Sequence, residues 1–173
     1  MRRVKLLVAT SLDGYIAGPN EDVDWLFMDQ DYGMSEFYRS IDTTLLGRKT
    51  FEFGERHGQV GYEGMHNYVF SRTPRPSEHA HVQWVTEDPA TCVATLRQQS
   101  GKDIWLVGGG ELFSHLARRQ QVDDISIAVH PIILGEGISL YQGIQEHIGL
   151  TLTGIDRYDS GLVTLHYRVE HER

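Results

Sequence analysis

Residues 105–113, Trp105-Leu106-Val107-Gly108-Gly109-Gly110-Glu111-Leu112-Phe113, read as a strand, a glycine turn and the first turn of a helix. In open α/β sheets, ligands bind beyond the carboxyl ends of the strands, which is where this turn would lie. Glycines let the backbone approach a ligand without a Cβ clash, and free N–H groups at a helix start suit a phosphate. A tight turn without a ligand is the alternative, but one glycine would suffice for it. The segment therefore favours a ligand site, and it matches neither the Rossmann nor the P-loop motif.

Apolar runs and helical patterns alternate on both sides of this segment. We expect strands at Val4–Thr10, Thr43–Gly47, Tyr68–Ser71, Asp103–Val107, Ile125–His130, Leu150–Ile155 and Leu162–Val169. We expect helices at Ser35–Ser40, from Pro89 to about Ser100 with Asp88 as N-cap, and from Glu111 to about Arg119. Residues 52–67 hold four glycines without a clear period, which indicates a long mobile loop. This order predicts an α/β fold, a single domain over residues 1–173, with a mainly parallel mixed sheet, helices on both faces and a C-terminal antiparallel hairpin.

The composition excludes several classes of function. Sixteen basic and 24 acidic residues give a net charge of −8, which argues against nucleic acid and against an anionic membrane surface as partners. The chain has no apolar stretch long enough to span a membrane, and its apolar N-terminal run is too short for a signal peptide. Cys92 is the single cysteine, so no intrachain disulfide can form, and we expect a cytoplasmic protein.

Two basic segments also follow predicted strands. Arg48, Lys49 and Thr50 come directly after the strand that ends at Gly47, and Ser71-Arg72 ends the next strand. A guanidinium, an ammonium and a hydroxyl at a helix start can hold a phosphate, and a solvated basic cap is the alternative. Residues 48–75 contain five basic and three acidic side chains, whereas the rest of the chain is net negative. The strand ends together fit a ligand with several phosphates, such as NADPH, and arginine favours the 2′-phosphorylated dinucleotide.

Four motifs, in order, resemble a known superfamily. Ser11-Leu12-Asp13-Gly14-Tyr15-Ile16-Ala17 looks like the opening of the reductase domain of the bifunctional riboflavin-biosynthesis deaminase/reductase, which shares the dihydrofolate-reductase fold. Gly47-Arg48-Lys49-Thr50-Phe51 and Val107-Gly108-Gly109-Gly110 look like the Gly-Arg-x-Thr segment and the glycine turn of dihydrofolate reductases. His130-Pro131-Ile132-Ile133-Leu134-Gly135-Glu136-Gly137 resembles a segment of the riboflavin branch. The resemblance runs from about Val4 to Val169.

This resemblance implies a three-layer fold with about eight strands, bound NADPH and hydride transfer to a planar heterocycle. It also implies a homodimer, and a cis peptide between Gly108 and Gly109. By position, the cofactor would meet Ala9, Ile16, Gly47, Arg48, Lys49, Thr50, Ser71, Arg72, Val107, Gly108, Gly109, Gly110, Glu111 and Leu112. Among these, Arg48 would meet the 2′-phosphate, and Ala9 and Ile16 the nicotinamide. Asn20, Trp25 and Asp31 would border the substrate.

The proton donor aligns less well. Dihydrofolate reductases carry a carboxylate on their first helix, and Asp31 is the nearest candidate here, with Glu36 or a water as alternatives. Asp31 also reads as a loop acid that favours a helix start. Asp13 reads better as a turn residue than as a site carboxylate. Val107 stands where the riboflavin reductase has a glutamate, and Glu111 where dihydrofolate reductases often have a basic residue.

The resemblance therefore implies an NADPH-dependent reductase most like 5-amino-6-(5-phosphoribosylamino)uracil reductase of riboflavin biosynthesis. The alternatives are a dihydrofolate reductase and a non-catalytic NADP(H)-binding module. The one close histidine pair, His79 and His81, lacks further ligands at metal-binding spacing, so we expect no metal site. The expected partners are a small heterocyclic substrate and a second copy of the chain.

Overall fold

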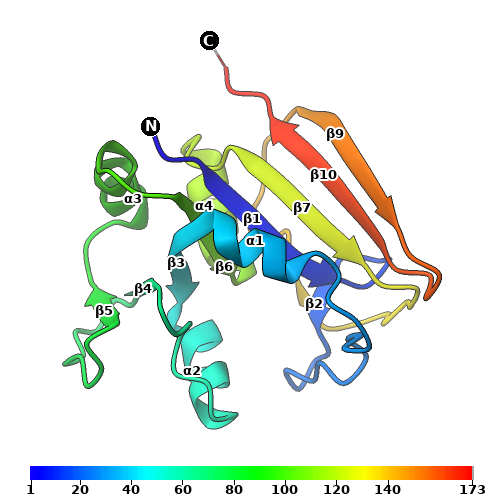
Figure 1. The fold of residues 1–173 in the computed structure, drawn as a ribbon, viewed down its shortest axis with the longest axis horizontal. Helices are drawn as coiled ribbons and strands as arrows, with labels where there is room; N and C mark the ends of the chain where they lie inside the picture. The colour runs from blue at the N-terminus through cyan, green and yellow to red at the C-terminus, as the bar shows by residue number, and fades with distance from the viewer. Residues whose placement is uncertain (173) are drawn as a thin grey trace.

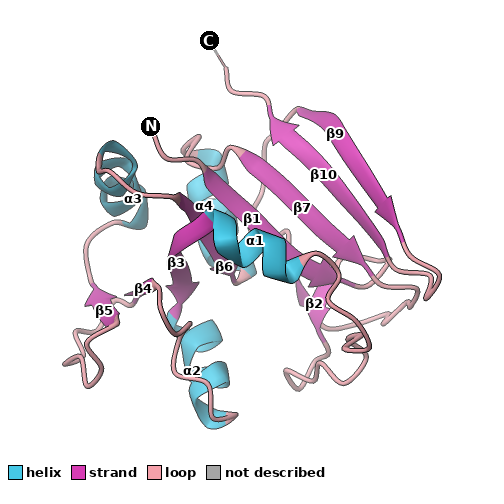
Figure 2. Ribbon diagram, viewed as in Figure 1, coloured by secondary structure: helices cyan, strands magenta, loops and turns pink. Residues whose placement is uncertain are grey.

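The computed structural model describes residues 1–172, which form one eight-stranded mixed sheet, a two-stranded ribbon and four helices (Figure 1). In chain order the elements are β1 (Val4–Thr10), β2 (Tyr15–Ala17), α1 (Met34–Ser40), β3 (Ile41–Gly47), α2 (Arg48–Arg56), β4 (His66–Phe70), β5 (Val82–Val85), α3 (Pro89–Gln98), β6 (Asp103–Gly108), α4 (Gly110–Arg118), β7 (Asp124–Val129), β8 (Ile138–Ser139), β9 (Leu150–Arg157) and β10 (Val163–Val169). The strand order in the large sheet is β5-β4-β3-β6-β1-β7-β10-β9. Neighbours from β5 to β7 are parallel, and β10 and β9 complete the sheet as antiparallel strands (Figure 2). This confirms the expected mainly parallel sheet with a C-terminal hairpin.

Helices cover both faces of the sheet and give the expected three layers. On one face, Phe113 and Leu116 of α4 belong to the same buried cluster as Leu106 of β6 and the buried residues of α3. On the other face, α1 packs over Trp105, whose ring centroid lies 5.4 Å from that of Phe37. Figure 1 shows α1 in front of the strands and α4 behind them. The alternation of side chains along β6 therefore supplies apolar surface to both helical layers.

The carboxyl ends of the six parallel strands meet along one edge of the sheet. We call this edge the carboxyl rim and the opposite edge the amino rim. Gly47 at the end of β3 pairs with Phe70 at the end of β4, and Leu46 pairs with Gly108 at the end of β6. Helix α2 follows β3 directly, and α4 begins two residues after β6. Two helix N-termini therefore open onto the carboxyl rim, as the sequence predicted.

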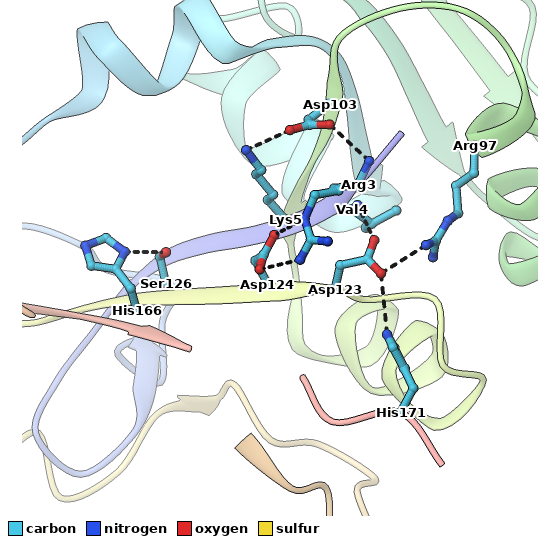
Figure 3. Close-up of polar contacts among 10 residues, drawn as sticks. All are labelled: Arg3, Val4, Lys5, Arg97, Asp103, Asp123, Asp124, Ser126, His166 and His171. Atoms are coloured by element: carbon cyan, nitrogen blue, oxygen red, sulfur yellow. Dashed lines mark hydrogen bonds and ion pairs between the residues drawn. The ribbon is translucent and has the colours of Figure 1, made fainter. Parts of the chain in front are cut away.

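The amino rim is held together by ion pairs (Figure 3). Arg3 contacts Asp124 at 2.7 Å, and Lys5 contacts Asp103 at 2.7 Å. The buried carboxylate of Asp123 accepts hydrogen bonds from the Val4 N–H, from Arg97 and from His171. Arg2 is buried against Asp42 and Thr43 in the same way. The first strand is thereby fixed between its two neighbours, β6 and β7.

The loop predicted over residues 52–67 is shorter than expected, because residues 52–56 belong to α2, residues 66–67 belong to β4 and only residues 57–65 lie outside helices and strands. Helix α2 extends to Arg56, and the turn that follows is organised by the buried Asn67. The Asn67 side chain accepts from the Tyr62 N–H at 2.8 Å and donates to carbonyls of Tyr62, Met65 and His81. A Cβ at Gly54 would stand 2.9 Å from the carbonyl oxygen of Gln59, so that glycine permits a close contact. Long-range hydrogen bonds of one side chain order this segment, and local patterns do not show them.

Three short strands, β2, β5 and β8, were not predicted. Strands β2 and β8 have three and two residues and form only a small ribbon, and β5 has four residues. Strands of two to four residues are too short to show the alternation of apolar and polar residues that identifies a strand in a sequence. None of the helices within residues 1–172 combines the length and apolar character needed to cross a membrane.

Candidate functional site

The glycine turn lies against two other elements of the carboxyl rim. The peptide between Gly108 and Gly109 is cis, as the resemblance implied. A Cβ added at Gly109 would stand 3.5 Å from the Thr50 hydroxyl and 3.8 Å from Cδ1 of Ile16. A Cβ at Gly47 would stand 3.6 Å from the backbone of Gly108 and Gly109. The turn, the start of α2 and strand β2 therefore converge on one place, where the side chains of Thr50 and Ile16 face Gly109 and the backbone of Gly47 faces that of Gly108 and Gly109.

The third glycine has a different role. A Cβ at Gly110 would stand 2.6 Å from the Ser139 carbonyl oxygen and 2.8 Å from that of Leu140, distances that no real Cβ tolerates. Gly110 therefore allows α4 to pack against the backbone around β8. The lack of a side chain at Gly110 therefore serves the packing of the protein, and the predicted contact of Gly110 with a cofactor would involve its backbone N–H.

The start of α2 presents the expected basic side chains. Arg48 and Lys49 are exposed, and Thr50 is half-buried. The Arg48 side chain is 48% exposed and lies 3.2 Å from Glu52, one turn along the helix. Within residues 1–172, no side chain caps the N-terminus of α2 or that of α4. Both sets of first-turn N–H groups therefore remain available to an anion.

The end of β4 adds a third group to this edge. The Ser71 N–H donates to the Val85 carbonyl, and the Ser71 hydroxyl accepts from the Thr73 N–H at 3.2 Å. Arg72 is exposed next to it, whereas Arg75 turns away to Glu55 at 3.0 Å and stacks over Trp84. Among residues 1–172, Lys49 and Arg72 form no ion pair with a carboxylate. Of the basic side chains that follow β3 and β4, these two are therefore free for a ligand, whereas Arg48 and Arg75 have carboxylate partners.

The remaining residues predicted to bind the cofactor surround the same turn. Val107 is half-buried and packs against the cluster around Phe51, and Ala9 is half-buried on β1. Glu111 is exposed in the first turn of α4, and Leu112 is buried beneath it. Leu112 therefore offers only its backbone N–H to the rim, and Glu111 adds a negative charge there.

Asp13 has the structural role that its sequence context favoured. Its carboxylate accepts from the Ser11 hydroxyl at 2.6 Å and from the N–H groups of Leu134 and Gly135 at 3.1 and 2.8 Å. The Ser11 hydroxyl and the two N–H groups together lower the pKa of Asp13 below its ordinary value. All of these contacts are within the protein, so Asp13 ties the first loop to the segment after β7.

The residues predicted to border the substrate fall into two groups. Trp25 is half-buried on the rim and Asn20 is exposed in the turn before it. Asp31 instead accepts from the hydroxyl and N–H of Ser35, at 2.6 and 3.1 Å, in the first turn of α1. The Ser35 hydroxyl lowers the pKa of Asp31, so its carboxylate stays ionised and is a poor proton donor. The structure thus gives Asp31 the helix-start role that was its alternative, and Glu36 is exposed on the same helix.

Sequence reasoning missed one residue of this region, His130. Its imidazole is 3% exposed and contacts the rings of Trp25 and Phe27, with centroids 5.3 and 5.1 Å apart. The signal was present in the sequence, because His130 opens one of the four motifs. Within residues 1–172, no three side chains of the kinds that bind metals gather into a cluster.

Comparisons with known proteins agree with this architecture. The family model described as the RibD C-terminal domain matches residues 2–164. The uncharacterized protein YwjB of Bacillus subtilis is 35% identical over 170 residues, which cover 96% of this chain and 97% of that protein. The crystal structure of a putative riboflavin biosynthesis protein from Shewanella sp. PV-4 superposes with a TM-score of 0.86 at 21% identity, covering 98% of this chain and 99% of that one.

A second solved structure is longer than this chain. It is the diaminohydroxyphosphoribosylaminopyrimidine deaminase/5-amino-6-(5-phosphoribosylamino)uracil reductase from Thermotoga maritima, with a TM-score of 0.75 and 18% identity. The match covers 97% of this chain and 56% of that protein. Both structures share the fold of this chain.

Proposed function

Since the chain belongs to the RibD C-terminal domain family, we propose that it is an NADPH-dependent oxidoreductase that passes a hydride to a planar heterocycle. The proposed substrate class is that of 5-amino-6-(5-phosphoribosylamino)uracil, the compound named for the Thermotoga protein of the same fold. The NADPH, when bound, supplies the hydride. The protein therefore has to bind the cofactor and the substrate, orient them toward each other and exclude water.

One observation carries the proposal: two uncapped helix N-termini converge at a glycine turn, on a rim that also carries two unpaired cations. The first turns of α2 and α4 both open onto the carboxyl rim without a capping side chain from residues 1–172. Gly47 and Gly109 keep the backbone free of Cβ atoms where the two helices approach each other. A pyrophosphate fits such a cradle, because it accepts hydrogen bonds from N–H groups that the protein leaves free.

The charged side chains are assigned by their positions in the motifs that resemble the dihydrofolate-reductase superfamily. Lys49 and Thr50 would hold the pyrophosphate, and Arg48 with Arg72 would hold the 2′-phosphate and border the adenosine. Arg48 would exchange its exposed contact with Glu52 for the phosphate, which costs little because exposed ion pairs of this kind contribute only about 0.3–0.5 kcal/mol. Glu111 is the one acidic side chain that opposes a phosphate at the start of α4.

The substrate would lie on the side of the turn that faces β2 and the first loop. Ile16 stands 3.8 Å from the Cβ position of Gly109, so Ile16 with Ala9 would contact the nicotinamide. Trp25 would stack on the heterocycle. With Asp31 held ionised by Ser35, the proton would come from Glu36 or from a water.

The test is an assay of NADPH oxidation with 5-amino-6-(5-phosphoribosylamino)uracil and, separately, with dihydrofolate. The expected result is turnover with the pyrimidine and none with dihydrofolate. Turnover with dihydrofolate alone would instead identify a dihydrofolate reductase. Tight NADPH binding with no turnover would identify a non-catalytic binding module, which the engagement of Asp31 favours as the second candidate.

The apolar face of β9 supports a second copy of the chain as partner. Leu150, Leu152 and Ile155 are 40, 50 and 57% exposed. A register shift beside His166 brings all three onto one face of the hairpin, opposite Val169, Tyr167 and Leu165 of β10. We propose that a second copy covers these three apolar side chains, because burial of apolar surface drives association even between copies of net charge −8. Sedimentation should show a dimer that Leu152→Glu dissociates, and a monomeric wild-type chain would contradict the proposal.

The net charge and the single thiol support proposals about the compartment and about the partners that the protein does not bind. We propose that the protein acts in a reducing cytoplasm and binds neither nucleic acid nor membrane. Cys92 is buried, and burial raises the pKa of its thiol to about 11, so the thiol is unreactive at neutral pH.

A further inference from the structure

His130 uses both nitrogens of its buried ring to hold backbone groups. It follows the last residue of β7, and its own N–H donates to the Thr10 carbonyl at the end of β1. Nδ1 lies 3.0 Å from the Ala128 carbonyl oxygen. Nε2 lies 3.2 Å from the Phe27 N–H, which donates to it. The ring therefore connects the end of β7 to the loop that carries Trp25 and Phe27.

These contacts fix the protonation of the ring. A carbonyl oxygen only accepts, so Nδ1 has to carry a hydrogen. An N–H group only donates, so Nε2 has to be free of one. The ring is therefore the neutral Nδ1–H tautomer, and no other common side chain supplies a donor and an acceptor at these two positions on a flat, buried frame.

The same segment is joined to the first loop at two further points. Asp13 binds the N–H groups of Leu134 and Gly135, and a Cβ at Gly137 would collide with the Ala17 carbonyl at 2.2 Å. Ala17 ends β2, the strand that brings Ile16 to the glycine turn. Residues 130–137 thus support the first loop from its beginning to Phe27, and His130 supports the end that carries the aromatic side chains.

We infer that His130 is a positioning residue of the reductase site, which sets the position of the Trp25–Phe27 backbone over the substrate side of the carboxyl rim. This inference rests on the proposed function for the identity of the substrate. Its ring touches neither the glycine turn nor the basic start of α2 among the contacts described, so His130 acts on the heterocycle and not on the dinucleotide.

Two amide variants separate the two ring nitrogens. In His130→Asn the amide reaches only the position of Nδ1, so the hydrogen bond from the Phe27 N–H is lost. In His130→Gln the longer side chain places an amide oxygen near the position of Nε2, so that bond is retained. Hydrogen exchange of the Phe27 amide should be about tenfold faster in the Asn variant and near wild-type in the Gln variant, as expected for one lost hydrogen bond.

The kinetic readout distinguishes positioning from general stability. The KM for 5-amino-6-(5-phosphoribosylamino)uracil should rise about tenfold in His130→Asn and much less in His130→Gln, while the Kd of NADPH changes less than twofold in both. Equal exchange rates in the two variants, or parallel losses of NADPH affinity, would overturn the inference. If the wild-type chain does not turn over this pyrimidine, the proposed substrate fails, and the exchange rates still decide whether His130 positions the loop.

A measurement on the wild-type protein covers the case in which the variants do not fold. The two ring nitrogens of His130 have distinct ¹⁵N resonances, which report the tautomer directly. The neutral Nδ1–H form is expected. An Nε2–H form, or a charged ring at neutral pH, would remove the hydrogen bond to Phe27 and with it the inference.

Discussion

At the amino rim, Arg3 and Lys5 each lie 2.7 Å from a carboxylate, and Arg97 is almost buried beside Asp123. At the carboxyl rim, Lys49 and Arg72 form no ion pair with any carboxylate of residues 1–172. Backbone N–H groups differ between the two rims in the same way: they are paired with side chains at the amino rim and uncapped at the carboxyl rim. The Val4 N–H donates to the Asp123 carboxylate, whereas the first N–H groups of α2 and α4 are left without a capping side chain.

Under the proposed function, this difference separates stability at the amino rim from cofactor binding at the carboxyl rim. Breaking a buried ion pair is costly, because the charge left behind is neither solvated nor paired. An unpaired exposed cation costs the fold little and keeps its charge for a ligand. Substitutions at the amino rim should therefore change the free energy of unfolding, and substitutions at the carboxyl rim should change affinity for the cofactor.

The largest effect is expected for Asp123→Ala. This substitution leaves the Arg97 guanidinium, 11% exposed, without its carboxylate, and the Val4 N–H without its acceptor. The free energy of unfolding should fall by about 3–5 kcal/mol, measured by urea denaturation. The neighbouring Asp124→Ala is the matched control. Its partner Arg3 is 43% exposed, so this substitution should lower the free energy of unfolding by about 1 kcal/mol or less. Similar losses in both variants would show that burial does not govern the amino rim.

Arg48→Ala should weaken cofactor binding and leave the free energy of unfolding almost unchanged, the reverse of the effect expected for Asp123→Ala. NADPH binding should weaken by about 1.5–3 kcal/mol, the cost of a charge-assisted contact with the 2′-phosphate, while NADH binding is unchanged. The free energy of unfolding should change by only about 0.3–0.5 kcal/mol, because only the exposed contact with Glu52 is lost. Fluorescence titrations of both dinucleotides with wild-type and variant protein measure this. Unchanged discrimination would place the 2′-phosphate elsewhere, with Arg72 the next residue to replace.

Adjacent glycines offer a test inside a single turn. Gly110→Ala should cost about 1–3 kcal/mol of unfolding free energy, because its Cβ would meet two backbone carbonyls at 2.6 and 2.8 Å. Gly109→Ala meets no atom closer than 3.5 Å and should cost less stability. It should weaken NADPH binding instead, because its Cβ would point into the space between Thr50 and Ile16. Equal thermal stability of the two variants would contradict this division of roles.

The smallest expected effect is a change in how the melting temperature depends on pH in the acid range. For Asp42 and Asp103 burial opposes ionisation, but the Lys102 N–H at Asp42 and the Lys5 ammonium at Asp103 outweigh it and lower both pKa values. A carboxyl whose pKa is lower in the folded chain stabilises the fold above its unfolded value, about 3.9 for aspartate, and this contribution is lost as the pH falls through the folded value. The melting temperature should therefore drop below about pH 4, and Asp103→Asn should flatten part of that drop. An unchanged pH profile in this variant would remove Asp103 from the acid response.

Local patterns predicted the elements whose residues repeat over several positions. Strand Val4–Thr10 was placed at both ends, and Asp88 caps α3 through the Thr91 N–H, as its sequence indicated. The convergence of Gly47, Thr50 and the glycine turn on one rim followed from the rule that parallel strands end on the same side.

Other features depend on contacts between distant residues, and the sequence alone did not give them. Asn67 orders the turn after α2 through carbonyls up to 14 residues away, so no short window contains that information. Asp31 was compatible with more than one role, and His130 was noted only as the start of a motif. The position of Ser35 next to Asp31 decides the role of Asp31, and the position of Phe27 next to His130 reveals that of His130.

The most direct test of the cofactor site is a titration of the wild-type protein with NADPH and with NADH, followed by nucleotide fluorescence. The free N–H groups of α2 and α4, with Lys49, Arg48 and Arg72, predict tight binding of NADPH and at least tenfold weaker binding of NADH. Failure of either dinucleotide to bind below millimolar concentration would contradict the assignment of the carboxyl rim as a dinucleotide site.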